Sequence, residues 1–202
     1  MLRQYIIGLL GVFLGVTLLS TAQATTLVPV DLTHLHKNSQ TVVYAECIDN
    51  KVEIDSRMNN TVVTYTTFSI MQTIKGATNQ TITIKQIGGK MPDNSMALTI
   101  PGVPEFKLNE KYVLFLPKAS HLGFSSPVGL GQGSFRAYKG TSGNMMVTNG
   151  RDFSELMGSM KAKNMSPAAR KIIDRIKKQK PLHVNQNTTL PLDDFILMLK
   201  NM

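Results

Sequence analysis

The sequence predicts a mainly β fold, either a small barrel of five or more strands or a sandwich, followed by a helical tail. Three observations support this prediction. At least five short runs are rich in β-branched and aromatic residues, and glycine-rich turns separate them. Beyond Gly150 the spacing of apolar residues changes to a helical period. The length of 202 residues suits one domain with its own core.

The first 24 residues have the features of a secretory signal peptide. Arg3 supplies a positive charge, residues 5–19 are apolar or small, and Ala22-Gln23-Ala24 has the small-x-small form of a cleavage site. The alternative is an uncleaved membrane anchor, but the apolar run is shorter than the roughly 20 residues that a bilayer requires. We therefore expect cleavage after Ala24, a secreted or periplasmic protein, and no transmembrane segment in the mature chain.

This division predicts a signal peptide at 1–24, a β-barrel-like domain at 25–150 and a helical, basic C-terminal extension at 151–202 packed on the barrel. No cysteine follows the cleavage site, so a lipid anchor is not expected. Cys47 is the only cysteine in the sequence, which excludes an internal disulfide. It lies in a strand-like run, where we expect a buried thiol.

The first half of the mature chain contains a short helix and three strands. Leu32 and Leu35 are three residues apart and predict a helical turn at 31–37. Strands are predicted at the following β-branched or alternating runs: 41–48, 62–74 and 80–87.

A long loop follows at 88–109, in which Pro92, Pro101 and Pro104 restrict the backbone. Residues 111–116 form the most apolar short run and predict a central strand. Further β segments are predicted at 124–128, 133–139 and 145–148, the last two joined by a hairpin through the glycine-rich turn at 140–144.

Three helices are predicted beyond residue 150. Ser154 is a candidate cap for the first, which carries Leu156, Met157 and Met160. Ser166-Pro167 starts the second, whose apolar stripe is Ile172, Ile173 and Ile176. The third runs to Lys200 with carboxylates in its first turn, and Phe195 and Leu199 are expected to dock it on the domain.

The basic residues concentrate in the second of these helices and around it. The net charge of +9 becomes +8 when Arg3 is removed, and an excess of this size favours anionic partners such as acidic lipid, lipopolysaccharide or acidic glycans. The region fits either a helix packed on the domain with its charges in water or a surface that binds an anionic partner. Because no aromatic residues lie among these charges to stack on bases, nucleic acid is not expected. The basic residues are Lys161, Lys163, Arg170, Lys171, Arg175, Lys177, Lys178 and Lys180.

No motif indicates a particular chemistry, so the sequence predicts no catalytic, cofactor-binding or metal-binding residue. His34 and His36 lack a second pair of ligands at metal-site spacing, and His121 and His183 are isolated. The glycines of 129–133 lack the Gly-Lys-Ser/Thr ending of a phosphate loop and indicate a turn or bulge. Glu105 and Glu110 flank Phe106 in a loop, without the position expected of a catalytic pair.

Eight short segments follow one another in a fixed order: Asp31-Leu32, Val42-Val43-Tyr44-Ala45, Phe68-Ser69-Ile70, Ile74-Lys75-Gly76, Ile87-Gly88-Gly89, residues 101–106, residues 109–116 and residues 129–135. In this order they resemble a family of uncharacterised secreted bacterial proteins. The strand that ends in Lys75-Gly76 and the later strand at 110–116 are also similar, more distantly, to the OB-type barrel of netrin-like modules and tissue inhibitors of metalloproteinases. This similarity implies an OB-like barrel of five strands. Those inhibitors use an N-terminal cysteine, whereas the predicted mature N-terminus is Thr25.

These observations favour an exported, non-enzymatic binding protein of the bacterial envelope or the extracellular space, with an unknown ligand. The loop at 88–106 and the basic tail are the expected binding surfaces, because OB-type barrels bind along one face and its adjoining loops. The partner would be an envelope or secreted protein, or an anionic surface that contacts the tail. Two alternatives stay open: an envelope enzyme or accessory subunit using residues such as His121 or Glu105, and a structural envelope protein.

Overall fold

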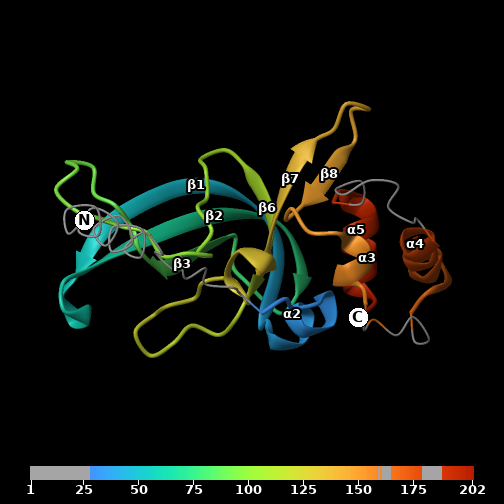
Figure 1. Cartoon of the computed structure of the whole chain (residues 1–202), viewed down its shortest axis with the longest axis horizontal. Helices are drawn as coiled ribbons and strands as arrows, with labels where there is room; N and C mark the ends of the chain where they lie inside the picture. The colour runs from blue at the N-terminus through green and yellow to red at the C-terminus, as the bar shows by residue number, and fades with distance from the viewer. Residues whose placement is uncertain (1–27, 159, 161–164, 179–187) are drawn as a thin grey trace, which may run out of the picture.

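The computed structural model describes residues 28–158, 160, 165–178 and 188–202, so the predicted signal peptide lies outside the described residues. The described residues form a seven-stranded antiparallel sheet, a two-stranded sheet and short helices (Figure 1). A mainly β fold with a helical C-terminal part is therefore confirmed. The strands are β1 Thr41–Asp55, β2 Thr61–Lys75, β3 Thr81–Ile87, β4 Gly89–Lys90, β5 Ala97–Leu98, β6 Lys111–Leu116, β7 Ser134–Lys139, β8 Met145–Thr148 and β9 Leu190–Pro191.

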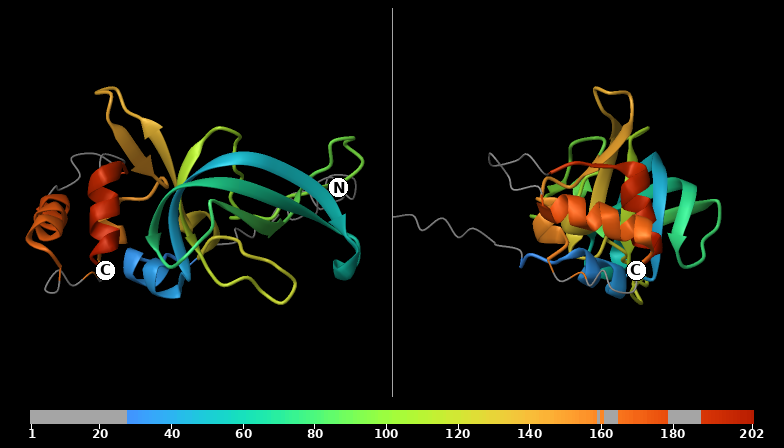
Figure 2. Two further views of the ribbon diagram at one scale, coloured as in Figure 1. Left: turned by 180° about the vertical axis from the view of Figure 1, so that it is seen from behind. Right: turned by 90° about the vertical axis from the view of Figure 1, so that its right-hand side faces the viewer.

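The large sheet has the strand order β3-β2-β1-β6-β7-β8-β9. Strand β1 pairs with β2 along nearly its whole length, but only residues 41–46 of β1 pair with β6. The β1–β2 hairpin, with β3 beside it, therefore extends beyond the rest of the sheet. It curves away from the helices, as Figures 1 and 2 show. Register shifts between β1 and β2, including one between Cys47 and Asp49, accompany this curvature.

The two faces of the sheet carry two separate cores, because side chains alternate along each strand. Val42, Tyr44 and Phe115 point into the larger core, which also receives the helices. Val43, Cys47 and other alternating residues point to the opposite face, where the smaller core forms. The smaller core consists of Val43, Ala45, Cys47, Phe68, Ile84, Phe106, Tyr112, Leu114 and Leu116. Cys47 is fully buried, as the sequence predicts.

The helices cover the larger core (Figure 1). Helix α2 Leu32–Asn38 is capped by Asp31, whose carboxylate accepts a hydrogen bond from the backbone N–H of His34. Three further helices pack at the same end of the molecule, and Phe195 lies among Phe115, Phe135 and Phe153. These helices are α3 Phe153–Leu156, α4 Pro167–Lys178 and α5 Leu192–Lys200.

The predicted cap at Ser154 is wrong by two residues. Asp152 caps α3, and its carboxylate accepts hydrogen bonds from the backbone N–H and the hydroxyl of Ser154. A carboxylate is a strong acceptor for the free N–H groups at a helix start, so Asp152 takes the position that Ser154 was expected to hold.

The large sheet is open: β3 and β9 form its edges, and the strands of the described part do not close into a barrel. The predicted strand at 124–128 is also wrong. Phe124 makes one parallel bridge to Lys85 on the free edge of β3, and the chain then turns away. Pro127 has no backbone N–H and Gly129 has a positive φ, so this segment is not suited to extending the bridge into a strand.

Candidate functional site

A cavity of about 410 Å³ lies between the β1–β3 end of the sheet and the loop that follows β3. We call it the loop cavity. The chain leaves β3 through Gly88 and Gly89, which both have positive φ, and the loop returns through the short β4–β5 pair. A Cβ at Gly88 would lie 2.6 Å from the carbonyl oxygen of Leu98, so this close return of the backbone requires glycine. The cavity is lined by Asn50, Thr64, Thr66, residues 86–90, residues 97–100 and residues 103–106.

The floor of the loop cavity is built from uncharged hydrogen-bonding side chains of three adjacent strands. The Thr66 hydroxyl donates to the Asn50 side-chain oxygen at 2.7 Å, and the Asn50 amide donates to the carbonyl of Phe106 at 2.8 Å. Gln86 donates to the carbonyl of Pro104 at 3.4 Å. Two amide side chains of the sheet thus hold the returning segment 104–106 in place as a wall of the cavity.

A cluster of three aromatic rings packs together at this wall. Phe106 meets Phe68 and Tyr112 edge-to-face, with ring centroids 5.0 Å apart in each pair. Edge-to-face contacts of this kind stabilise a defined ring orientation. All three rings are buried in the smaller core. The position of the wall is therefore fixed both by hydrogen bonds and by packing.

A second cavity, of about 490 Å³, shares Pro104 and Glu105 with the loop cavity. It is more highly charged. The Tyr112 hydroxyl donates to Glu110 Oε2 at 2.8 Å and accepts from the backbone N–H of Lys107 at 3.1 Å. Arg136 Nη1 lies 3.8 Å from Glu110 Oε1. Burial, together with the neighbouring Glu110 carboxylate, raises the pKa of Tyr112 to about 12, so its phenol stays protonated and acts as a donor.

The structure places the two glutamates of the sequence analysis at the same cavity but in different roles. Glu110 is engaged by Tyr112 and Arg136, whereas Glu105 is exposed on the wall between the cavities. In the described residues no hydrogen bond joins the two carboxylates. The arrangement gives a polar, charged cavity.

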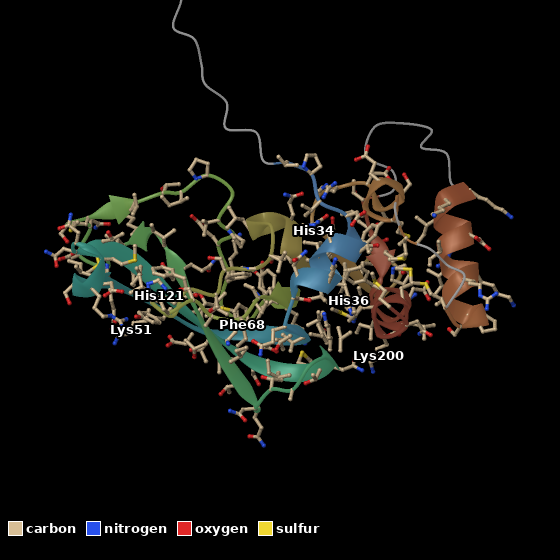
Figure 3. All side chains as sticks on the ribbon, turned by 90° about the horizontal axis from the view of Figure 1, so that it is seen from below. His34, His36, Lys51, Phe68, His121 and Lys200 are labelled. Carbon is tan, nitrogen blue, oxygen red and sulfur yellow. The ribbon has the colours of Figure 1, made fainter. Side chains whose placement is uncertain are left out.

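The histidines are not brought together. His34 and His36 lie on α2, and His121 lies in an exposed turn toward the other end of the molecule (Figure 3). Burial, with Lys75 nearby, lowers the pKa of His36. Within the described part of the chain, no three His, Cys, Asp or Glu side chains cluster as metal ligands would. His183 lies outside the described residues.

The structure also shows where the glycine-rich segment 129–133 and the basic helix lie. The glycines of 129–133 form a 3-10 turn, η2 Leu130–Gly133, directly before β7. Helix α4 buries Ala169, Ile172, Ile173 and Ile176 against the larger core. Its basic side chains remain exposed, and Arg175 forms an ion pair with Asp194 of α5. Lys161, Lys163 and Lys180 lie outside the described residues.

Sequence reasoning missed one buried ion pair. Lys85 of β3 and Asp55 of β1 form an ion pair in which both side chains are almost fully buried, 3% and 6% exposed. The Lys85 ammonium also donates to the carbonyl of Leu122 at 3.0 Å and lies 4.4 Å from the ring centroid of Phe124. These contacts hold the 117–128 loop against the edge of the sheet. In the sequence, Lys85 looks like an ordinary exposed residue of an alternating strand.

No family model, curated protein or solved structure matches the chain. None of the described helices is long and apolar enough to cross a bilayer. The loop cavity and its charged neighbour are therefore the features on which a functional proposal can be based.

Proposed function

We propose that the chain is an exported, non-enzymatic binding protein of the bacterial envelope or extracellular space, and that its ligand occupies the loop cavity. The observation that carries the proposal is the convergence of Asn50, Thr66 and Gln86, from three strands, on a cavity roofed by the 88–106 loop. Concave sites with apolar walls and a few placed polar groups are the usual form of a ligand-binding pocket. The proposed export rests on the signal-like residues 1–24.

The test uses a variant that fills the loop cavity without touching its floor. Ala97 is exposed and lines the cavity, so Ala97→Trp should obstruct it. Met96 is the exposed neighbour and does not line the cavity, so Met96→Trp is the matched control. Purified exported protein in each form is immobilised and incubated with native envelope extract and culture medium, and the bound proteins, lipids and glycans are identified by mass spectrometry.

We expect one component to be retained by the wild type and by Met96→Trp and to be lost with Ala97→Trp. Retention that is equal in all three forms would remove the loop cavity from the function. Stable self-assembly without any retained component would favour the alternative of a structural envelope protein.

The exposed basic face of α4 supports a second candidate, contact with an anionic membrane surface. Its apolar stripe is already buried in the core, so only charge is available for this contact. Substituting Lys171, Lys177 and Lys178 by glutamine should weaken binding to vesicles that contain acidic lipid, and salt should weaken binding of the wild type in the same way. Unchanged vesicle binding by the variant would exclude the helix as a membrane contact.

The charged second cavity supports the enzyme alternative, because it brings a carboxylate, a phenol and a guanidinium together. An unassisted enzyme would turn over an envelope substrate as the isolated protein, and Glu110→Gln would abolish that turnover. Activity seen only in the presence of a second protein would instead indicate an accessory subunit.

A further inference from the structure

The polar groups that face the loop cavity retain unused hydrogen-bonding capacity. An amide group has two N–H donors, and the Asn50 and Gln86 amides each use one on a carbonyl of the wall. The side-chain oxygen of Gln86 accepts no hydrogen bond from the described residues. No fully buried side-chain N or O among these residues lacks a partner, so this oxygen keeps some exposure, and Gln86 lines the cavity.

The charges of the lining residues also limit the kind of ligand that the loop cavity favours. The side chains that the sheet contributes to the floor are uncharged. Lys90 and Glu105, the charged residues of the lining, are both exposed and have opposite signs. A charged ligand would lose its hydration in this cavity without gaining an opposite charge at the floor, which is unfavourable. The site therefore favours an uncharged ligand with both donor and acceptor groups.

The loop also contributes apolar side chains to the cavity. Leu98, Ile100 and Val103 are half-buried and line it. A ligand that matches the lining carries C–H or methyl groups as well as polar groups. The volume of about 410 Å³ lies toward the lower end of the range of about 300–1,000 Å³ found for small-molecule sites. It suits a compact ligand.

We propose that the loop cavity binds an uncharged saccharide of one or two rings that carries acetamido groups. An acetamido group offers one N–H donor and one carbonyl acceptor to the amides of Asn50 and Gln86, and its methyl group suits the apolar side chains of the loop. The sugar hydroxyls can use a remaining lone pair of Thr64, whose own proton is donated to the carbonyl of Gly88. This inference rests on the proposed function, because it names the ligand class of the same cavity.

The probe is the β-1,4-linked disaccharide of N-acetylglucosamine, titrated into the purified exported protein by calorimetry and by NMR of the side-chain amides. We expect saturable binding that shifts the Asn50 and Gln86 amide signals. Met96→Trp should bind as the wild type does, and Ala97→Trp should not bind. Gln86→Leu should weaken binding at least tenfold, and cellobiose, which lacks acetamido groups, should bind more weakly than the probe.

Gln86 is buried, so its variant is first checked for the wild-type unfolding temperature. If Gln86→Leu does not fold, the comparison of Ala97→Trp with Met96→Trp at exposed positions carries the test. Absence of binding by the wild type would overturn the proposal, as would equal binding by Ala97→Trp. Tighter binding of an uncharged capped dipeptide would also overturn it and would identify a peptide site.

The failure of this inference is distinguishable from failure of the proposed function. If envelope material is retained in an Ala97-dependent way while the disaccharide does not bind, the saccharide class is wrong and the binding function stands. If neither is bound, both proposals fall.

Discussion

Lys85 shows how one residue determines the placement of a loop. Its ammonium is paired with Asp55, bonded to the carbonyl of Leu122 and placed over the ring of Phe124. Removal of one member of a buried ion pair leaves the other charge uncompensated, which is strongly destabilising. We expect Lys85→Met to lower the unfolding temperature and to speed hydrogen exchange at the backbone N–H of Ser125, which donates to the carbonyl of Lys85.

Lys51→Met is the matched control for this prediction. Lys51 pairs with Glu53 on the same strand, but both side chains are exposed. Exposed ion pairs contribute little to stability, so this variant should unfold at nearly the wild-type temperature. Equal effects of the two substitutions would show that burial of the Lys85 pair is not what stabilises the loop.

The same pair makes stability depend on pH. The hydrogen bond from Lys85 holds the pKa of Asp55 below its ordinary value of about 3.9. A carboxyl group whose pKa is lower in the folded state stabilises the protein above the unfolded value, and this stabilisation is lost as the pH falls through the folded value. Denaturant unfolding between neutral pH and pH 3 should therefore show a loss of stability on acidification that is smaller in Asp55→Asn. If acidification lowered the stability of Asp55→Asn by as much as that of the wild type, Asp55 would not be the source of this pH dependence.

At the scale of elements, the 88–106 loop depends on the backbone geometry at its start. Gly88→Ala should destabilise the protein, because the added Cβ meets the backbone carbonyl of Leu98 and φ is +95°. Gly143 also has a positive φ, of +84°, but a Cβ there meets no atom within 4 Å. Gly143→Ala should therefore lose only the conformational contribution, about 1–2 kcal/mol. Chemical denaturation of both variants measures the difference, and equal losses would rule out the close contact as the cause.

The sequence predicts some elements well and others poorly, for physical reasons. Strand β6 is predicted to the residue, because Lys111–Leu116 is paired on both sides and reads as a continuous apolar run. Strand β1 extends seven residues beyond its predicted end at Ile48, because its distal half is half-exposed and polar, and its strand state comes from pairing with β2.

The sequence likewise predicts one part of the candidate site and not another. The 88–106 loop is predicted as a place to look, since its prolines and glycines are visible in the sequence. The convergence of Asn50, Thr66 and Gln86 is not predictable from the pattern, because it depends on the register of β1, β2 and β3 across a bulge. Similarly, nothing in the local sequence indicates that Asp55 forms an ion pair with Lys85.

At the scale of the whole molecule, the larger core joins the start and the end of the described chain. It contains Leu32 of α2, Phe115 of the central strand and Leu199 of α5. A shared core favours a single cooperative transition. Far-ultraviolet dichroism and NMR signals from α5 and β6 should lose native structure at the same denaturant concentration. Separate midpoints would show that the helical part unfolds independently of the sheet.

The wall formed by Pro104 and Glu105 has two faces, one on each cavity. Any occupant that displaces this wall changes the room available on its other side. Occupancy of the loop cavity and the state of the Glu110, Tyr112 and Arg136 group are then thermodynamically linked, and such linkage is reciprocal. Protonation or ion binding at the charged cavity would change the affinity of the loop cavity for its ligand by some factor. Ligand binding in the loop cavity would then change the affinity of the charged cavity for that proton or ion by the same factor.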